Sequence, residues 1–162
     1  MGGIPEDFRQ ANLFSHSKFP GKIACVGSFD KFEKHGNLIN IPHHSFFFHP
    51  DLIEAADFVI GKAGYSTMAE IYNAAKPFGY LLRPDFRESP VLGKFLSDLP
   101  YTIEVEKEKF DQFELDEYFE KLMVNPSYDH PVKNGSEIAA DFILKVLQQE
   151  QSFPALQSAF QG

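Results

Sequence analysis

The chain has 162 residues, 43% hydrophobic and 23% charged, and this size and composition predict one globular domain with a substantial core. Its formal net charge of −8 argues against nucleic acid or an anionic membrane as a partner, because both require clustered Lys and Arg. The single cysteine, Cys25, rules out an internal disulfide framework and a cysteine-based metal site, which suits a reducing compartment.

The ends of the chain carry few signals. The N-terminus lacks the basic and apolar regions of a secretion signal, and no stretch approaches the roughly 18 apolar residues of a membrane span. We therefore expect a cytoplasmic protein without a membrane span. We predict a domain over residues 1–147 and a tail over 148–162.

Short apolar runs alternate with longer helical segments along the chain, a pattern typical of a parallel sheet covered by helices. The predicted strands are 22–28, 38–42, 57–62, 78–83 and 101–106. The predicted helices are 50–56, 66–75, 89–97, 111–123 and 135–149. The fold class that follows is α/β, with a Rossmann-like parallel sheet covered by helices on both faces.

Two details refine the helix predictions. Pro50 suits the first position of a helix, where its missing N–H costs nothing. In the acidic stretch that leads into the helix at 111–123, we expect Phe110, Phe113 and Tyr118 to turn inward, with the charges on a solvated face.

The stretch GKAGYSTMAE, residues 61–70, joins a predicted strand to a predicted helix. Thr67 and Glu70 fit a T-x-x-E capping box, and that role would suffice to explain the pattern. The alternative is ligand binding at the carboxyl end of a parallel strand, where helix N–H groups attract phosphate, Gly64 admits an anion and Glu70 reaches a ribose. The stretch is neither a P-loop nor a G-x-G-x-x-G fingerprint. Its spacing leaves capping and ligand binding equally open.

A wider pattern favours ligand binding. Ala55 to Asp57 precede a strand, G-x-x-T-x-x-E follows at 64–70, Pro77 precedes the next strand, and the pair Glu88-Ser89 follows it. This order resembles the carboxyl-terminal, donor-binding half of GT-B glycosyltransferases. It is most similar to the bacterial N-acetylglucosaminyltransferases of peptidoglycan synthesis and to the glycosyltransferase-like domain of arabinokinases. The resemblance follows the element order over nearly the whole chain.

The resemblance implies a nucleotide-sugar site, with a UDP-sugar as the expected ligand. It implies that glycine turns and the helix start face the diphosphate and that the helix glutamate binds the ribose. It also implies that the acidic/amide pair holds the sugar and that the loop before the first helix packs on the base. The residues at these positions are Gly2, Gly3, Ser45, Phe46, Gly64, Tyr65, Ser66, Thr67, Glu70, Glu88 and Ser89.

Two positions depart from the family pattern. Ser89 and Pro90 stand where a glutamine is expected, which removes an amide able to donate to and accept from sugar hydroxyls. Tyr65 is bulky where a small residue is usual, although a Gly-Tyr pair is similar to the arabinokinase-type domains. The donor sugar is therefore left open.

The resemblance also implies the chemistry. GT-B enzymes of this kind invert the anomeric carbon without a metal or other cofactor, and helix N–H groups stabilise the leaving diphosphate. Their general base normally comes from an amino-terminal acceptor-binding half, so we expect the chain to need such a partner for transfer. The alternatives are a non-catalytic nucleotide-sugar sensor or subunit, and part of a GT-B-like epimerase or hydrolase.

Histidines and phenylalanines gather just before the first predicted helix. His43, His44 and His49 match no familiar zinc spacing, which favours a loop near a ligand cleft over a metal site. The run at 46–48 has three adjacent phenylalanines, which cannot share one face of a regular element. At least one of them is expected to meet a ligand or partner.

The start of the chain resembles the glycine turn that follows the first strand of the family's carboxyl-terminal half. In the order 3-2-1-4-5-6 that strand is central, so its loss would leave a one-strand gap between 22–28 and 57–62. We expect Met1 to be an internal methionine of a longer chain. Closure of the sheet and a strand from a partner are the alternatives.

Overall fold

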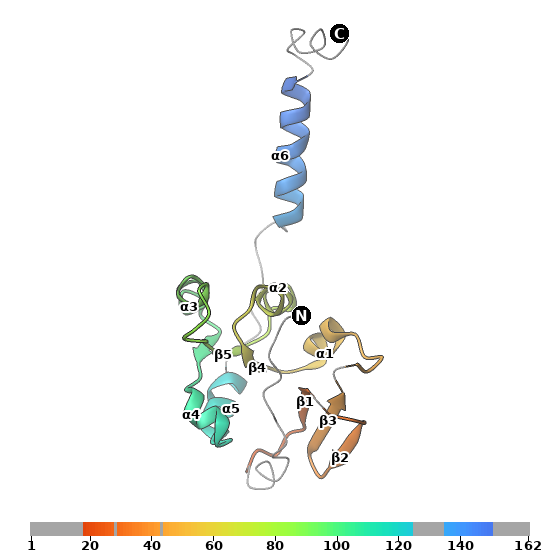
Figure 1. Cartoon of the computed structure of the whole chain (residues 1–162), viewed down its shortest axis with the longest axis vertical. Helices are drawn as coiled ribbons and strands as arrows, with labels where there is room; N and C mark the ends of the chain where they lie inside the picture. The colour runs from red at the N-terminus through yellow and green to blue at the C-terminus, as the bar shows by residue number, and fades with distance from the viewer. Residues whose placement is uncertain (1–17, 28, 43, 125–134, 151–162) are drawn as a thin grey trace. The chain divides into compact units, whose positions relative to one another are not determined.

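The computed structural model describes residues 18–27, 29–42, 44–124 and 135–150 (Figure 1). The chain divides into two compact units, Met1–Tyr128 and Asp129–Gly162, which are described separately. The described part of the second unit is one helix, α6 (Gly135–Glu150), and the predicted domain boundary after residue 147 falls inside it. Gly2, Gly3 and His43 lie outside the described residues.

The described part of the first unit contains six strands and five helices. The strands are β1 (Ile23–Gly27), β2 (Glu33–His35), β3 (Leu38–Pro42), β4 (Val59–Lys62), β5 (Phe78–Leu81) and β6 (Thr102–Glu104). The helices are α1 (His49–Ala55), α2 (Tyr65–Ala74), α3 (Ser89–Ser97), α4 (Lys107–Asp111) and α5 (Asp116–Met123).

The strands form two three-stranded sheets, with the orders β1-β3-β2 and β4-β5-β6. β1 and β3 run parallel, as do all three strands of the second sheet. This parallel sheet with its helices confirms the predicted α/β, Rossmann-like class. Within the described residues, β1 and β4 each stand at the end of a sheet, where the predicted strand order has its gap.

Strand β5 explains why helices cover both faces of the second sheet. All four of its residues are buried, and successive side chains of a strand point to opposite faces. Phe78 and Tyr80 pack in one apolar cluster with residues of α1, α2 and α3, whereas Leu81 packs in another with residues of α5. Because both faces are buried, the strand is apolar throughout instead of alternating with polar residues. α2 and α3 therefore lie across the sheet from α5 (Figure 1).

One strand was not predicted. β2 pairs antiparallel with β3 through a turn in which Gly36 adopts a φ of 62°, a left-handed conformation that glycine tolerates well. The strand itself reads Glu-Lys-His, so it lacks the apolar alternation by which strands are recognised. Its pairing follows from the turn and from the buried neighbour β3.

The predicted helix at 111–123 is wrong in its first part. The chain instead forms two helices, α4 and α5, because Phe113 between them takes a left-handed φ of 59°. The inward side chains are confirmed: Tyr118 is buried, and Phe110 and Phe113 pack against the same cluster. The apolar contacts were therefore predictable, whereas the turn that allows them was not.

The close packing over β5 gives a stability prediction. A Cβ at Gly79 would stand 2.9 Å from Ile60, 3.0 Å from Val105 and 3.3 Å from Leu122, whereas a Cβ at Gly61 would meet no atom of the described residues within 4 Å. We expect Gly79→Ala to destabilise the protein by about 1–3 kcal/mol, the usual cost of overpacking a core. Gly61→Ala, on the neighbouring strand, is the matched control and should change stability little. Urea unfolding measures both, and equal stability of the two variants would contradict this packing.

Candidate functional site

The predicted motif lies where β4 meets α2 (Figure 1). Two residues separate the end of the strand from the first residue of the helix. The N–H of Met68 donates to the carbonyl of Gly64 at 2.8 Å and makes the first turn of α2. The N–H groups of Tyr65, Ser66 and Thr67 precede that bond, so the helix offers them no carbonyl. These groups form the positive end of the helix dipole.

The capping-box interpretation is wrong. The N-cap of α2 is Gly64, and no side chain of the described residues makes a capping hydrogen bond there. Thr67 already belongs to the first turn, because Tyr65 is helical and the helix starts earlier than the T-x-x-E pattern indicates. Glu70 then falls in the second turn, where its carboxylate has a different partner. Thr67 and Glu70 therefore do not form a capping box, and Glu70 contacts His49 instead.

Gly64 is not needed for the backbone conformation. Its φ of −151° and ψ of 149° are extended values that any residue adopts. No atom of the described residues lies within 4 Å of the position a Cβ would take, unlike at Gly79 and Gly93, where a Cβ would meet side chains within 3 Å. A side chain at residue 64 would therefore fill open space in front of the start of α2.

Glu70 is held by a histidine from the preceding helix. Nδ1 of His49, the first residue of α1, lies 2.6 Å from Oε2 of Glu70. An ionised carboxylate only accepts hydrogen bonds, so Nδ1 is the donor. The side chains of His49 and Glu70 are 32% and 24% exposed, so both are partly buried and a ligand can still reach them from solvent. The contact joins the start of α1 to the second turn of α2.

An exposed aromatic surface leads into His49. Phe46, Phe47 and Phe48 are all exposed, Phe46 to 92%, which confirms that the run is not buried as a whole. The Phe46 ring stacks on the Phe47 ring with 4.7 Å between their centroids, and the centroids of the Phe47 and Phe32 rings are 6.2 Å apart. The backbone N–H of the predicted residue Ser45 donates to the carbonyl of Pro42 at 3.0 Å and shapes this loop. A contact between Phe46 and a base remains a prediction.

The predicted sugar-binding pair lies at the start of α3. The Ser89 hydroxyl is buried, accepts from the Arg83 N–H at 3.2 Å and donates to the Arg83 carbonyl at 2.7 Å. It therefore closes the loop between β5 and α3, and this role accounts for its burial. Glu88 is the N-cap residue of α3, and its carbonyl accepts hydrogen bonds from the N–H groups of Val91 and Leu92. The residue is only partly buried. Of the two, Glu88 is better placed to meet a ligand.

These segments share one edge of the sheet. Gly64, Tyr65, Ser66 and Thr67 follow β4, whereas Glu88 and Ser89 follow β5, its parallel neighbour. The carboxyl ends of parallel strands meet at the edge where open α/β sheets bind ligands. Most of the predicted residues that the structure describes therefore lie at that edge. The hydrogen bond between His49 and Glu70 connects α2 to the end of the loop that carries Ser45 and Phe46.

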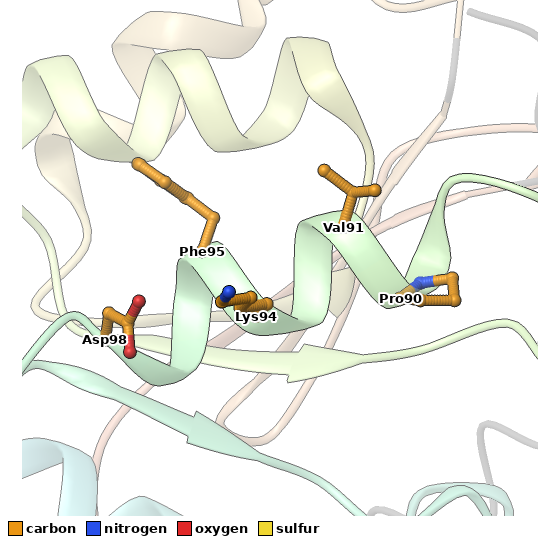
Figure 2. Close-up of a pocket in the computed structure, with 5 residues that line it drawn as sticks. All are labelled: Pro90, Val91, Lys94, Phe95 and Asp98. Carbon is orange, nitrogen blue, oxygen red and sulfur yellow. The ribbon is translucent and has the colours of Figure 1, made fainter.

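A separate hollow of about 370 Å³ runs along α3, lined by Pro90, Val91, Lys94, Phe95 and Asp98 (Figure 2). Val91 and Phe95 extend to the same side of the helix and are 65% and 47% exposed. The Phe95 ring also lies 6.4 Å from the ring of Tyr72 on α2. None of the predicted site residues lines this hollow.

Cys25 is a weak candidate for chemistry. It lies in β1, and burial raises the pKa of its thiol to about 12. Only the thiolate is a good nucleophile or metal ligand, so at neutral pH this side chain is inert.

Two features are absent from the described residues. No group of three or more His, Cys, Asp and Glu side chains there is arranged to hold a metal ion. No helix in the described ranges has both the length and the apolar character that a bilayer crossing requires.

Comparisons with known proteins give one informative match. No protein-family model and no solved structure matches the chain. L-arabinokinase of Arabidopsis thaliana is 29% identical over 145 residues, which cover 88% of this chain and 13% of that protein. The chain is therefore similar, over most of its length, to a small part of a plant L-arabinokinase.

Proposed function

We propose that this chain binds a nucleotide-sugar at the start of α2, as the donor-binding half of a GT-B-type glycosyltransferase. The observation that carries the proposal is the place of the start of α2, which follows a parallel strand and has space at Gly64 that no described residue fills. A helix start of this kind attracts a diphosphate through its N–H groups and its dipole. We expect a UDP-sugar as the donor.

The neighbouring residues fit the rest of such a ligand. Glu70 lies about one turn beyond the N–H groups, where its carboxylate accepts hydrogen bonds from ribose hydroxyls. Phe46 offers an exposed ring for the base, and Glu88 lies at the same edge of the sheet for the sugar. The ligand would thus lie across the carboxyl ends of β4 and β5.

The similarity to an arabinokinase supports a role linked to sugars. That relative is named for a sugar substrate, and the match covers the segments that form the proposed site. Because the chain spans 13% of the relative, the activity of the whole relative is not carried over. The proposal concerns ligand binding by the part that is shared.

Transfer needs a second component. A sugar-transfer step requires a base to take the proton of the attacking hydroxyl, while the diphosphate leaves with the electrons of the glycosidic bond. The proposed site supplies N–H groups that stabilise the leaving diphosphate, and we assign the base to an amino-terminal acceptor-binding half. The chain by itself is then a binding module.

The open space at Gly64 gives the first binding test. Gly64→Ala keeps an allowed backbone conformation but places a methyl group in front of the N–H groups, so we expect UDP to bind about tenfold more weakly, as for one lost charged hydrogen bond. Gly61→Ala, which also meets no neighbour, is the matched control and should bind normally. Titration calorimetry with UDP measures both. Equal affinity of the two variants, or no binding by the wild type, would contradict the proposal.

The missing base gives a test of activity. We expect the purified chain to bind a UDP-sugar without transferring or hydrolysing it, because a binding site without a base lowers no proton-transfer barrier. Release of UDP from UDP-sugars, followed by chromatography, measures this. Turnover above a Glu70→Ala control would show that the chain is a hydrolase or complete transferase and would overturn the assignment of the base to a partner.

A further inference from the structure

The orientation of the Glu70 side chain is not determined by its own helix. A glutamate on a helix surface samples several rotamers, and binding a ligand to one of them has an entropic cost. In this structure Glu70 is not a helix cap, and His49 is its partner. The two residues are 21 positions apart and come from different helices, so local helix geometry does not bring them together.

We propose that His49 is a positioning residue for the ribose contact. Its Nδ1–H holds Oε2 of Glu70 and leaves Oε1 to accept a hydrogen bond from a ribose hydroxyl. The inference rests on the proposed function and adds to it a residue that selects for ribose.

The chemistry of the pair fits a hydroxyl ligand. With Oε2 engaged by the imidazole, the remaining oxygen is an acceptor with no proton of its own, so its partner must be a donor. A sugar hydroxyl can donate, whereas a phosphate oxygen at neutral pH cannot and is repelled by the carboxylate. The pair therefore favours binding of the ribose hydroxyls at Glu70. The diphosphate then binds the N–H groups one turn earlier in α2.

The position of His49 limits its effect to Glu70. It directly follows the exposed run at 46–48, and it begins the helix that packs on α2 through Ile53 in the cluster of buried apolar side chains. Because Ile53 holds α1 on α2 without the hydrogen bond, loss of that bond should free the Glu70 side chain and leave the run at 46–48 in place.

The experiment compares UDP with 2′,3′-dideoxy-UDP, which lacks both ribose hydroxyls. We expect the wild type to bind UDP about tenfold more tightly, as for one hydrogen bond to a charged group. His49→Leu should bring this ratio close to one while leaving the affinity for dideoxy-UDP nearly unchanged. His49→Asn keeps a donor at the position of Nδ1 and should restore most of the ratio.

Two controls separate positioning from folding. His35→Leu removes another histidine–glutamate contact, an exposed 3.3 Å pair with Glu33, and should leave the ratio unchanged. In a Glu70→Ala background, His49→Leu should have no further effect on the ratio. If His49→Leu fails to fold by circular dichroism, His49→Gln replaces it, because its amide lies too far along the side chain to occupy the position of Nδ1.

The outcomes that overturn the inference are distinct. Wild-type protein that does not bind UDP refutes the proposed function and the inference with it. UDP binding with an unchanged ratio in His49→Leu leaves the proposed function intact but refutes the role of His49. Equal weakening of both nucleotides would show a merely structural histidine, and tighter UDP binding in His49→Leu would show that it competes with the ligand.

Discussion

The burial of β5 on both faces is the constraint on which the rest of the first unit depends. Phe78 and Tyr80 require apolar cover on one face, and Leu81 requires it on the other. Ile53, Met68 and Leu92 provide that cover for the first face, so α1, α2 and α3 all pack on one cluster. This packing brings the first residue of α1 within hydrogen-bonding distance of α2. The site therefore follows from how the core is filled.

The start of α2 is distinguished by its place after a parallel strand, because the starts of α1, α3, α4 and α5 likewise have no side-chain capping hydrogen bond from the described residues. Its N-cap is a glycine in an extended conformation, and the one acidic residue of the motif is turned to His49. Glycine costs this helix start little, because a serine, threonine or aspartate at an N-cap is better than glycine by only a few tenths of a kcal/mol. A helix start whose N–H groups have no side-chain acceptor is consistent with anion binding, because the anion then supplies the acceptors.

The sequence was informative where apolar residues set the structure. The strand at 38–42 and the helix at 89–97 were predicted with their observed bounds, because buried periodic positions define them. β2 and the break between α4 and α5 were missed, since a three-residue polar strand and one left-handed phenylalanine have no periodic signal. The proposed site residues on α2 followed from motif and resemblance, but the contact of His49 with Glu70 did not. Its contact joins residues 21 positions apart, and only the packing of two helices creates it.

The central claim is that the N–H groups at the start of α2 bind the diphosphate. The most direct measurement is a titration of ¹⁵N-labelled protein with UDP, followed through the backbone amide resonances. The account predicts that the largest shifts fall on Tyr65, Ser66 and Thr67, with a smaller response at Glu70. Shifts confined to the hollow along α3, or no shift at the start of α2 while UDP binds, would contradict it.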